Sequence, residues 1–451
     1  MGEDVKRLLV ALVIIAASRI HAFIGLPWAA EDGLIAFRVA RNWSDGIGPY
    51  FQATEHVGSV TSLLWTAMLA FGAELGFQID RWARFLALGL DLLTVVAAWR
   101  ILGPRVVWFA LVFALPLFAG ASASGLETPL VTCALAWCAV TPWAVGVLAL
   151  VRPEGILAGL AFAPGRAWLP WVLGSAVQLG ANSYLFGAWV PTAEAKALVY
   201  GIHPFAGWFW LAPVIPMGLG QPVGAMEHLH ELQLAALPMI AESFKRHWRL
   251  ATASAVVLLA YWASGTAGFW WYGVPWYAGL AIVACGANLT LPRAFRWCAV
   301  AVLLSLQVSG WKAIGALWGS ELPLRSIAER LEHERGTVFL EPAGHIGWAG
   351  RNLRLVDEVG LITPWVAERR ANGEPGWWTD VVRRERPDWI VVRAAMLLET
   401  DPKAFAGVGQ PVRSRADLDS ATAGYSVVEQ HGVQASDRSL VLLRRIDAKR
   451  H

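Results

Sequence analysis

A succession of long apolar runs fills the sequence from Leu8 to about Trp311. A helix needs about 20 mainly apolar residues to cross the hydrocarbon core of a bilayer, and several runs approach that length. The chain is 56% hydrophobic and 16% charged, whereas an ordinary soluble domain is about 25% charged. This apolar surplus must face lipid. The predicted fold class is therefore a polytopic α-helical membrane protein with about 10 to 12 hydrophobic helices.

Several candidate spans are short or are interrupted by Gly and Pro, which is tolerated at membrane depth only where protein or a cavity covers the backbone. Segment 143–163 is broken by Arg152-Pro153, and segment 232–243 is too short to cross by itself. The candidates are residues 8–26, 59–76, 84–99, 106–120, 126–141, 143–163, 167–187, 205–221, 232–243, 250–266, 269–288 and 295–312.

Basic residues between the runs predict the orientation. The positive-inside rule places Lys6-Arg7, the cluster 245–249 and the pair Arg293 and Arg296 in the cytoplasm. The N-terminus is then cytoplasmic and the last span runs outward. Because the N-terminus and the C-terminal domain are then on opposite sides of the membrane, the chain must cross it an odd number of times. One of the twelve candidate spans given above should therefore not cross. We expect a membrane module over residues 1–315, with a first outer loop at about 27–58, and an extracytoplasmic domain over residues 318–451.

The C-terminal domain alternates strand-like and helix-like stretches. Strands are predicted at 337–341, 353–356, 389–392, 426–429 and 440–443, and helices at 363–371 and 377–385, which together make a small α/β layer. It contains no glycine-rich phosphate loop and no nucleophile elbow. All four cysteines lie in the apolar runs, so no disulfide is expected in this domain. The sequence has no basic run interleaved with aromatic residues, so it does not indicate nucleic acid as a partner.

The first outer loop is the most unusual segment because two adjacent carboxylates, Glu31 and Asp32, open it. If the loop is helical, Leu34, Phe37 and the pair 40–41 follow the spacing of an amphipathic helix in the membrane interface, with Trp43 as an anchor. Carboxylates at a helix N-terminus also have a purely structural explanation in capping and in the helix dipole. Both interpretations stay open at this point.

Ionisable residues within or beside the apolar runs suggest function, because a charge in a span is costly. Glu127 lies at the mouth of a span, Arg152 and Glu154 break another, and Lys196 follows a third. The structural alternatives are an interhelical salt bridge or a side chain that reaches the interface.

Two further groups are weaker signals. His228 and His230 point to different faces of a helix, so a metal site there is not favoured. The sequence identifies no cofactor with certainty. A divalent metal is compatible with it, but no motif indicates one. The aromatic cluster 269–277 is typical of an interfacial belt. It also fits a groove for a prenyl chain or a sugar.

The order of the motifs resembles that of a known family. The first loop carries Glu31-Asp32-(x)2-Ile35-(x)-Phe37-Arg38-(x)-Ala40-Arg41-Asn42, and later come Ser124-Gly125-Leu126-Glu127-Thr128, Arg152-Pro153-Glu154-Gly155, Pro191-(x)3-Ala195-Lys196, Val356-Asp357-(x)2-Gly360-Leu361 and Pro387-Asp388-Trp389. In this order they resemble GT-C glycosyltransferases. More closely, they resemble the branch with the mycobacterial cell-wall arabinofuranosyltransferases and their bacterial relatives. The likeness extends over nearly the whole chain.

The resemblance implies an inverting transferase of the bacterial inner membrane. It would take a polyprenyl-phosphate-linked sugar and pass it to a glycan, lipid or protein acceptor at the outer face. Asp32, with Glu31, would be the catalytic base, although the family usually has two aspartates here. Glu127 would orient the acceptor or the base, and Lys196, Arg38, Arg152 and Glu154 would lie at the donor phosphate.

Three other classes compete with this interpretation. A lipid-linked substrate transporter or flippase would need a continuous polar pathway and often repeated halves, and no internal duplication is visible. A non-catalytic scaffold or receptor would explain Glu31 as a mark of lost activity. A phosphoethanolamine transferase would need a metal site in a large soluble domain, and the sequence shows no such cluster of Asp and His.

Overall fold

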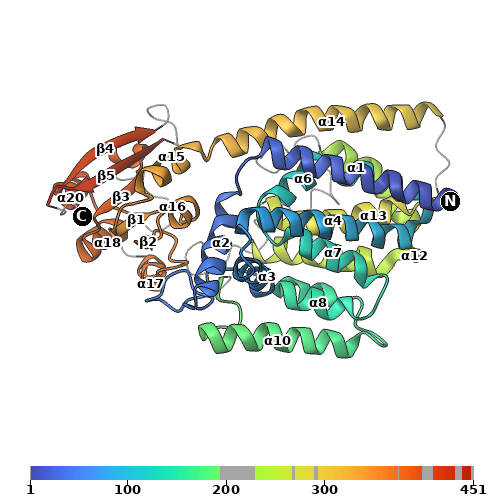
Figure 1. Ribbon diagram of the computed structural model, residues 1–451, viewed down its shortest axis with the longest axis horizontal. Helices are drawn as coiled ribbons and strands as arrows, with labels where there is room; N and C mark the ends of the chain where they lie inside the picture. Colours follow the sequence, from blue (N-terminus) through green and yellow to red (C-terminus); the bar gives the residue numbers. More distant parts are fainter. Residues whose placement is uncertain are drawn as a thin grey trace. The chain divides into compact units, whose positions relative to one another are not determined.

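The computed structural model describes residues 2–192, 229–266, 270–288, 293–373, 375–398, 410–431 and 439–447 (Figure 1). It separates into two compact units. The helical unit comprises Met1–Ala29, Ser62–Ala181 and Ile202–Trp318, and the α/β unit comprises Ala30–Thr61, Asn182–Gly201 and Gly319–His451. The segment expected to form the first outer loop therefore groups with the C-terminal domain.

The helical unit is built almost entirely from apolar helices. They are α1 (Glu3–Gly25), α3 (Leu63–Glu74), α4 (Ile79–Leu102), the 3-10 turn η1 (Gly103–Arg105), α5 (Val106–Phe113), α6 (Pro116–Ala123), α7 (Thr128–Cys138), α8 (Ala144–Val151), α9 (Pro153–Gly159), α10 (Trp168–Phe186), α12 (Leu229–Ser264), α13 (Trp270–Cys285) and α14 (Arg293–Gly319). Within the described ranges, two stretches, Glu3–Gly25 and Ile79–Phe113, are both long and apolar enough to cross a membrane. The expected count of about 10 to 12 goes beyond these two, and the predicted span 205–221 lies outside the described residues.

Prolines divide two of the predicted spans. The predicted segment 106–120 forms α5 and α6, which are separate helices because α6 begins at Pro116 and Leu115 before it is extended. In the same way, Arg152 is extended before Pro153, so α8 and α9 are separate, as the sequence predicted. The predicted segments 232–243 and 250–266 instead form one helix, α12, with a kink at His247.

A buried polar cluster joins three helices of this unit. Arg19 of α1 donates from Nε to Asp91 Oδ2 of α4 at 2.6 Å, and Ser122 of α6 donates to the same oxygen at 2.5 Å. Arg19 and Asp91 are 0% and 1% exposed. A charge in such surroundings is tolerated only when it is paired, so this cluster fixes the register of α1, α4 and α6.

The α/β unit contains a five-stranded sheet in the order β2-β1-β3-β5-β4. Strand β1 pairs in parallel with β2 and β3, whereas β5 pairs antiparallel with β3 and β4. The strands are β1 (Gly336–Leu340), β2 (Leu353–Asp357), β3 (Trp389–Arg393), β4 (Tyr425–His431) and β5 (Leu440–Arg445). All five lie where the strand-like stretches of the sequence predicted them, so the predicted sheet is confirmed.

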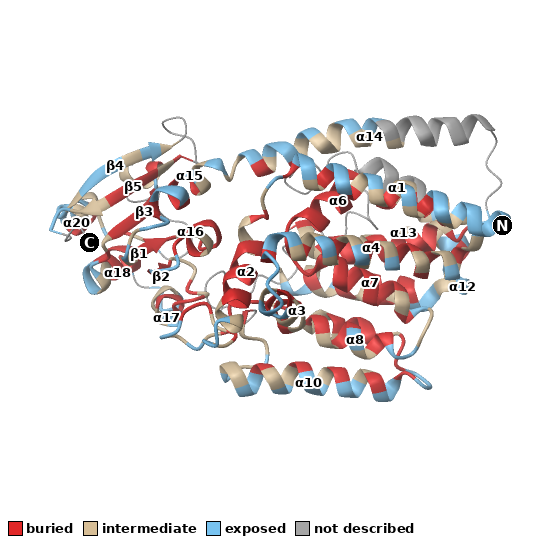
Figure 2. Cartoon of the chain, viewed as in Figure 1, coloured by how far each residue is buried: buried red, intermediate tan, exposed pale blue. Residues whose placement is uncertain are grey.

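Helices of the same unit accompany this sheet. They are α2 (Glu31–Ser44), α15 (Leu322–Leu331), α16 (Gly344–Ala349), α17 (Pro364–Ala371), α18 (Trp377–Glu385), α19 (Ala394–Leu398) and α20 (Arg415–Thr422). Phe339 and Ile390 of the sheet pack with Trp378 of α18, and all three are 0% exposed. Figure 2 shows β1 and β3 as buried and β4 as largely exposed. The predicted helices 363–371 and 377–385 correspond to α17 and α18.

Helix α2 forms as predicted, but its surroundings differ from the expectation. Residues Gly33–Arg41 are all buried, which an interfacial helix with one polar face would not show (Figure 2). The helix packs against α16, and Trp43 is half-buried rather than an exposed anchor. The prediction of an interfacial helix is therefore wrong, because long-range packing within the α/β unit covers the face that the pattern left polar.

Candidate active site

The first residue of α2, Glu31, is bound by a helix from the C-terminal part of the chain. Glu31 Oε2 accepts a hydrogen bond from the His345 backbone N–H at 2.8 Å, and Oε1 accepts one from Gly344 N–H. The ring of His345 lies between two carboxylates, with Nε2 3.0 Å from Glu321 Oε2 and 3.9 Å from Glu31 Oε2. Glu31 thus caps α16 rather than its own helix.

Burial controls the charge of this carboxyl. Loss of solvation raises the pKa of Glu31 from 4.5 to about 7, and the nearby His345 and the two backbone donors offset only part of that effect. Glu31 therefore titrates near neutral pH, so a proton on this group would change its contact with α16.

Asp32 is the second residue of α2 and is half-buried. Successive side chains on a helix are rotated by about 100°, so Asp32 and Glu31 face different directions. The two carboxylates that the sequence analysis grouped as the base therefore have different surroundings. Both carboxylate oxygens of Glu31 accept hydrogen bonds from the backbone of α16.

Arg38 makes a different set of contacts from those expected at a phosphate. Its Nη1 donates to Gly347 O at 2.7 Å, Nη2 to Leu353 O at 3.0 Å and Nε to Phe51 O at 3.0 Å. The side chain is buried and lies over the Phe51 ring. Burial lowers its pKa to about 9, so the group stays cationic at neutral pH. These contacts favour a structural role for Arg38, which connects α2 to the segment from α16 to β2.

In the helical unit, two turns bring Glu127 and Arg152 to defined positions. Helix α6 ends before Gly125, which adopts a left-handed φ of 83°, and Glu127 is the N-cap residue that precedes α7. Trp65 fixes that turn by donating from Nε1 to Gly125 O at 2.9 Å. Arg152 is extended because Pro153 follows it, which directs its side chain out of the helical ladder.

The structure brings Glu127, Arg152 and Glu154 together. Arg152 Nη1 lies 3.2 Å from Glu127 Oε1, and Nη2 lies 2.7 Å from Glu154 Oε1. Tyr261 of α12 donates to Glu154 Oε1 at 2.5 Å, and the Arg152 guanidinium lies 4.7 Å from the ring centre of Tyr272 of α13. All three charged side chains are at least 86% buried, since their exposed fractions are 8%, 4% and 14%. We call these three residues the carboxylate–arginine cluster.

The charge and the remaining donors of this cluster limit what it can bind. One guanidinium and two carboxylates give a formal net charge of −1, which disfavours a phosphate beside them. Arg152 Nε and Thr128 Oγ1 are buried and have no hydrogen-bond partner among the residues that the structure describes. Buried donors without partners are unusual, and sugar hydroxyl groups would satisfy them.

Other expected site residues fall elsewhere. Lys196 and His228 lie outside the described residues, as does part of the aromatic cluster 269–277. The described ranges contain no group of three or more His, Cys, Asp or Glu that could hold a metal ion. Sequence reasoning missed His345, Glu321 and Tyr261. His345 and Tyr261 lie in segments without a recognisable local motif, whereas Tyr272 belongs to the aromatic cluster that the sequence had indicated.

Comparison with known proteins gives two sequence matches. Residues 319–442 match the family model described as Domain of unknown function (DUF8728). A segment of 155 residues is 34% identical to the terminal beta-(1->2)-arabinofuranosyltransferase of Mycobacterium tuberculosis. That match includes 31% of this chain and spans 25% of the length of the mycobacterial protein.

Solved structures resemble the chain over almost its entire length. ArnT from Cupriavidus metallidurans bound to undecaprenyl phosphate superposes with a TM-score of 0.52, covering 96% of this chain and 97% of ArnT. The chain has the GT-C fold. ArnT in the apo state gives a TM-score of 0.50, and the identities of 16% and 14% mean that these likenesses concern the fold alone.

The likeness to ArnT covers both the helical unit and the α/β unit. The GT-C fold is a polytopic membrane fold, so the apolar helices and the C-terminal sheet are parts of one known architecture. Within it, the carboxylate–arginine cluster is a group of charges in the helical unit. The carboxylate pair of α2 is a separate group in the α/β unit.

Proposed function

We propose that the chain is an inverting glycosyltransferase that moves a sugar from a polyprenyl-phosphate carrier to an acceptor. The observation that carries this proposal is the 34% identity over 155 residues to an arabinofuranosyltransferase in a chain with the GT-C fold. ArnT, which shares that fold, was solved with undecaprenyl phosphate bound, which supports the class of carrier. The donor sugar is a pentose or hexose, and the acceptor is a glycan, lipid or protein of the cell envelope.

Asp32 is the catalytic base in this proposal. Its carboxylate takes the proton from the acceptor hydroxyl as that oxygen bonds to the anomeric carbon. The bond from that carbon to the lipid phosphate breaks on the opposite face, which inverts the configuration and releases the lipid phosphate. Glu31 is a positioning residue, because both of its oxygens accept hydrogen bonds from α16.

The carboxylate–arginine cluster recognises hydroxyl groups rather than the donor phosphate. Its net negative charge and its unpartnered donors at Arg152 and Thr128 support this assignment over the phosphate contact first expected for Arg152 and Glu154. The donor phosphate is assigned to Lys196, since a cation stabilises the charge that develops on the leaving group. Arg38 acts as a structural tie.

The orientation follows from the basic clusters. The N-terminus is cytoplasmic, and the α/β unit with Asp32 lies outside the bacterial inner membrane.

The experiment that tests the proposal measures transfer of radiolabelled sugar from a panel of polyprenyl-phosphate donors by the purified full-length chain. Wild type is compared with Asp32→Asn and Glu31→Gln. The matched control is Asp45→Asn, which neutralises an exposed carboxylate after the other end of α2.

Loss of the base should lower turnover by about 100-fold or more in Asp32→Asn, whereas Asp45→Asn should keep it. Glu31→Gln should lose less turnover than Asp32→Asn. If Asp32→Asn and Glu31→Gln both insert into membranes and turn over as the wild type does, the assignment of the base is wrong. If no donor supports transfer to any acceptor fraction of the cell envelope, the result would favour a non-catalytic scaffold or receptor over a transferase.

A further inference from the structure

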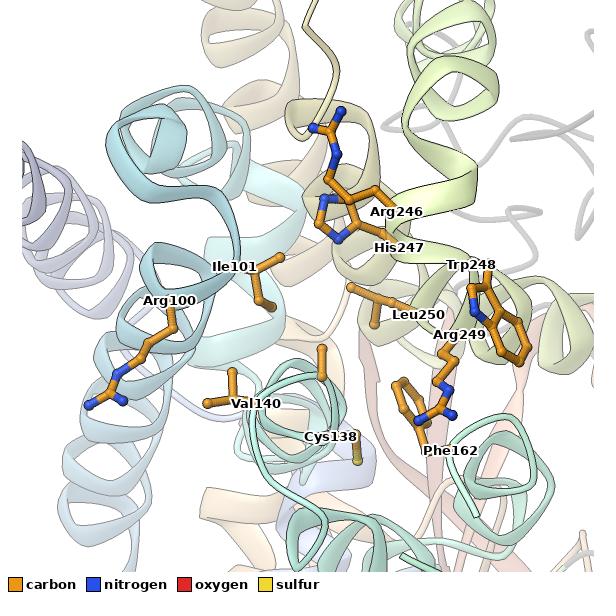
Figure 3. Close-up of a pocket in the computed structure, with 11 residues that line it drawn as sticks. Arg100, Ile101, Cys138, Val140, Phe162, Arg246, His247, Trp248, Arg249 and Leu250 are labelled. Carbon is orange, nitrogen blue, oxygen red and sulfur yellow. The ribbon is translucent and has the colours of Figure 1, made fainter. Parts of the chain in front are cut away.

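A cavity of about 540 Å³ opens in the helical unit where α4, α7 and α12 meet. Arg100 of α4 and Arg246 and Arg249 of α12 lie at its margin, whereas Ile101, Val140 and Leu250 lie in the middle of the labelled group (Figure 3). We call this cavity the arginine-rimmed pocket. It combines a cationic rim with an apolar floor.

The kink in α12 creates this arrangement. His247 has non-helical φ and ψ angles of −122° and 26°, so the basic run 245–249 does not continue the regular face of the helix. The residue after α13 contacts the kinked run, because Arg246 Nη1 donates to Gly286 O at 3.0 Å. The kink and this hydrogen bond together place Arg246, His247 and Arg249 around the pocket.

The positive charge of the rim is poorly balanced. No carboxylate is among the residues that the structure places around the pocket. Arg246 has Glu242 at 4.0 Å, and over the described ranges Arg100 and Arg249 have no ion pair. A planar guanidinium binds phosphate oxygens through two parallel hydrogen bonds. Because Arg246 already donates to Gly286 O, Arg100 and Arg249, on opposite sides of the pocket, are the guanidinium groups of the rim that favour an anionic headgroup (Figure 3).

Orientation alone would not require such a pocket. The positive-inside rule asks only for basic residues near the cytoplasmic ends of the helices, and it does not ask for a concave surface or an apolar floor. A volume of about 540 Å³ falls in the range of small-molecule sites. Trp248 beside the rim is 43% exposed, and exposed tryptophan is typical of the headgroup level of a membrane.

We propose that the arginine-rimmed pocket binds the phosphate headgroup of an anionic membrane lipid, with the start of an acyl chain over Ile101, Val140 and Leu250. Basic pockets between helices on the cytoplasmic side of membrane proteins recognise such headgroups. On the predicted orientation, this lipid belongs to the cytoplasmic leaflet, opposite the face proposed for sugar transfer. The site therefore serves stability or regulation and does not rest on the transferase activity.

The test is a binding measurement on the full-length chain in a neutral detergent. The melting temperature is followed as phosphatidylglycerol, phosphatidylcholine or inorganic phosphate is added to wild type, Arg100→Gln and Arg249→Gln. The matched control is Arg81→Gln, which removes an exposed arginine near the other end of α4. None of these residues has a role in the proposed transfer reaction.

Phosphatidylglycerol should raise the melting temperature of wild type and of Arg81→Gln, and phosphatidylcholine should not. The apparent affinity should fall about fivefold in Arg100→Gln and in Arg249→Gln, because about 1 kcal/mol is expected for each arginine near a headgroup. An equal response of all four proteins would overturn the proposal, as would an equal effect of phosphatidylcholine. A shift that inorganic phosphate reproduces would identify a free anion site and overturn the lipid assignment.

Discussion

Neighbouring residues of one type can serve different purposes when the helix that carries them is buried. Glu31 and Asp32 are consecutive carboxylates, yet Glu31 caps α16 through two backbone N–H groups. The longer side chain explains why a glutamate suits this position, since it must reach another helix. The departure from the usual pair of aspartates is therefore compatible with Asp32 as the base.

The raised pKa of Glu31 predicts a pH-dependent stability. Its pKa is about 7 in the folded chain against an ordinary 4.5, so the folded state binds more protons between these values. This contribution is fully present below pH 4.5 and is lost as the pH rises through 7. It amounts to at most about 3 kcal/mol. The melting temperature should therefore fall from pH 5 to 8 in wild type and fall less in Glu31→Gln.

Two other buried carboxyls act in the same direction, because burial raises the pKa of Asp357 to about 6 and that of Glu358 to about 7. Part of the slope should persist in Glu31→Gln for this reason. Glu332→Gln, at an exposed position, is the control and should keep the whole slope. Identical slopes in Glu31→Gln and wild type would contradict the assigned titration.

Arg152 predicts a second effect at the residue scale. Its removal leaves Glu127 and Glu154 as buried carboxylates without their cation, and breaking a buried pair costs about 3 to 5 kcal/mol. Arg152→Met should therefore lose the monodisperse folded peak in size-exclusion chromatography. The triple variant Glu127→Gln/Arg152→Met/Glu154→Gln should recover it, because no net charge stays buried. A stable single variant would show that the cluster is hydrated rather than dry.

At the scale of elements, local sequence patterns predicted which helices and strands form. Their tertiary partners depend on contacts between residues far apart in the sequence. The five strands and helices α17 and α18 follow from strand-like and helix-like patterns within short segments. The partner of α2 could not be predicted, because Glu31 and Gly344 are 313 residues apart. Glu127, Arg152 and Glu154 each drew notice as charges among apolar residues, but their mutual contact and Tyr261 required the tertiary structure.

The contact between α2 and α16 predicts a clear effect of one methyl group. A Cβ added to Gly344 would lie 1.9 Å from Glu31 O, so Gly344→Ala must push the two helices apart. Overpacking of this kind costs about 1 to 3 kcal/mol. Gly424→Ala is the control, since a Cβ there has nothing within 4 Å. Thermal unfolding in detergent should show a lower midpoint for Gly344→Ala alone, and equal midpoints would rule out this close approach.

At the scale of the whole molecule, residues 30–61 complete the C-terminal domain. Gln52 Oε1 accepts from Leu355 N–H at 2.6 Å, and Gln52 Nε2 donates to Leu355 O at 2.9 Å. Leu355 belongs to β2, which is an edge strand of the sheet. An unpaired edge invites association with other chains, so this segment protects the sheet. The region matched by the family model, 319–442, does not include the segment.

A fragment of residues 319–451 should therefore be incomplete without residues 30–61. Expressed alone, it should elute as higher oligomers, because the edge of β2 and the surface of α16 are uncovered. Co-expression with a tagged 30–61 segment should give a one-to-one complex with a higher melting temperature. A 30–61 segment with Arg38→Ala and Gln52→Ala should bind more weakly, because it lacks the hydrogen bonds to the backbone of α16 and β2. A monomeric fragment that melts at the same temperature with and without the segment would mean that the domain folds alone and that α2 docks on a finished surface.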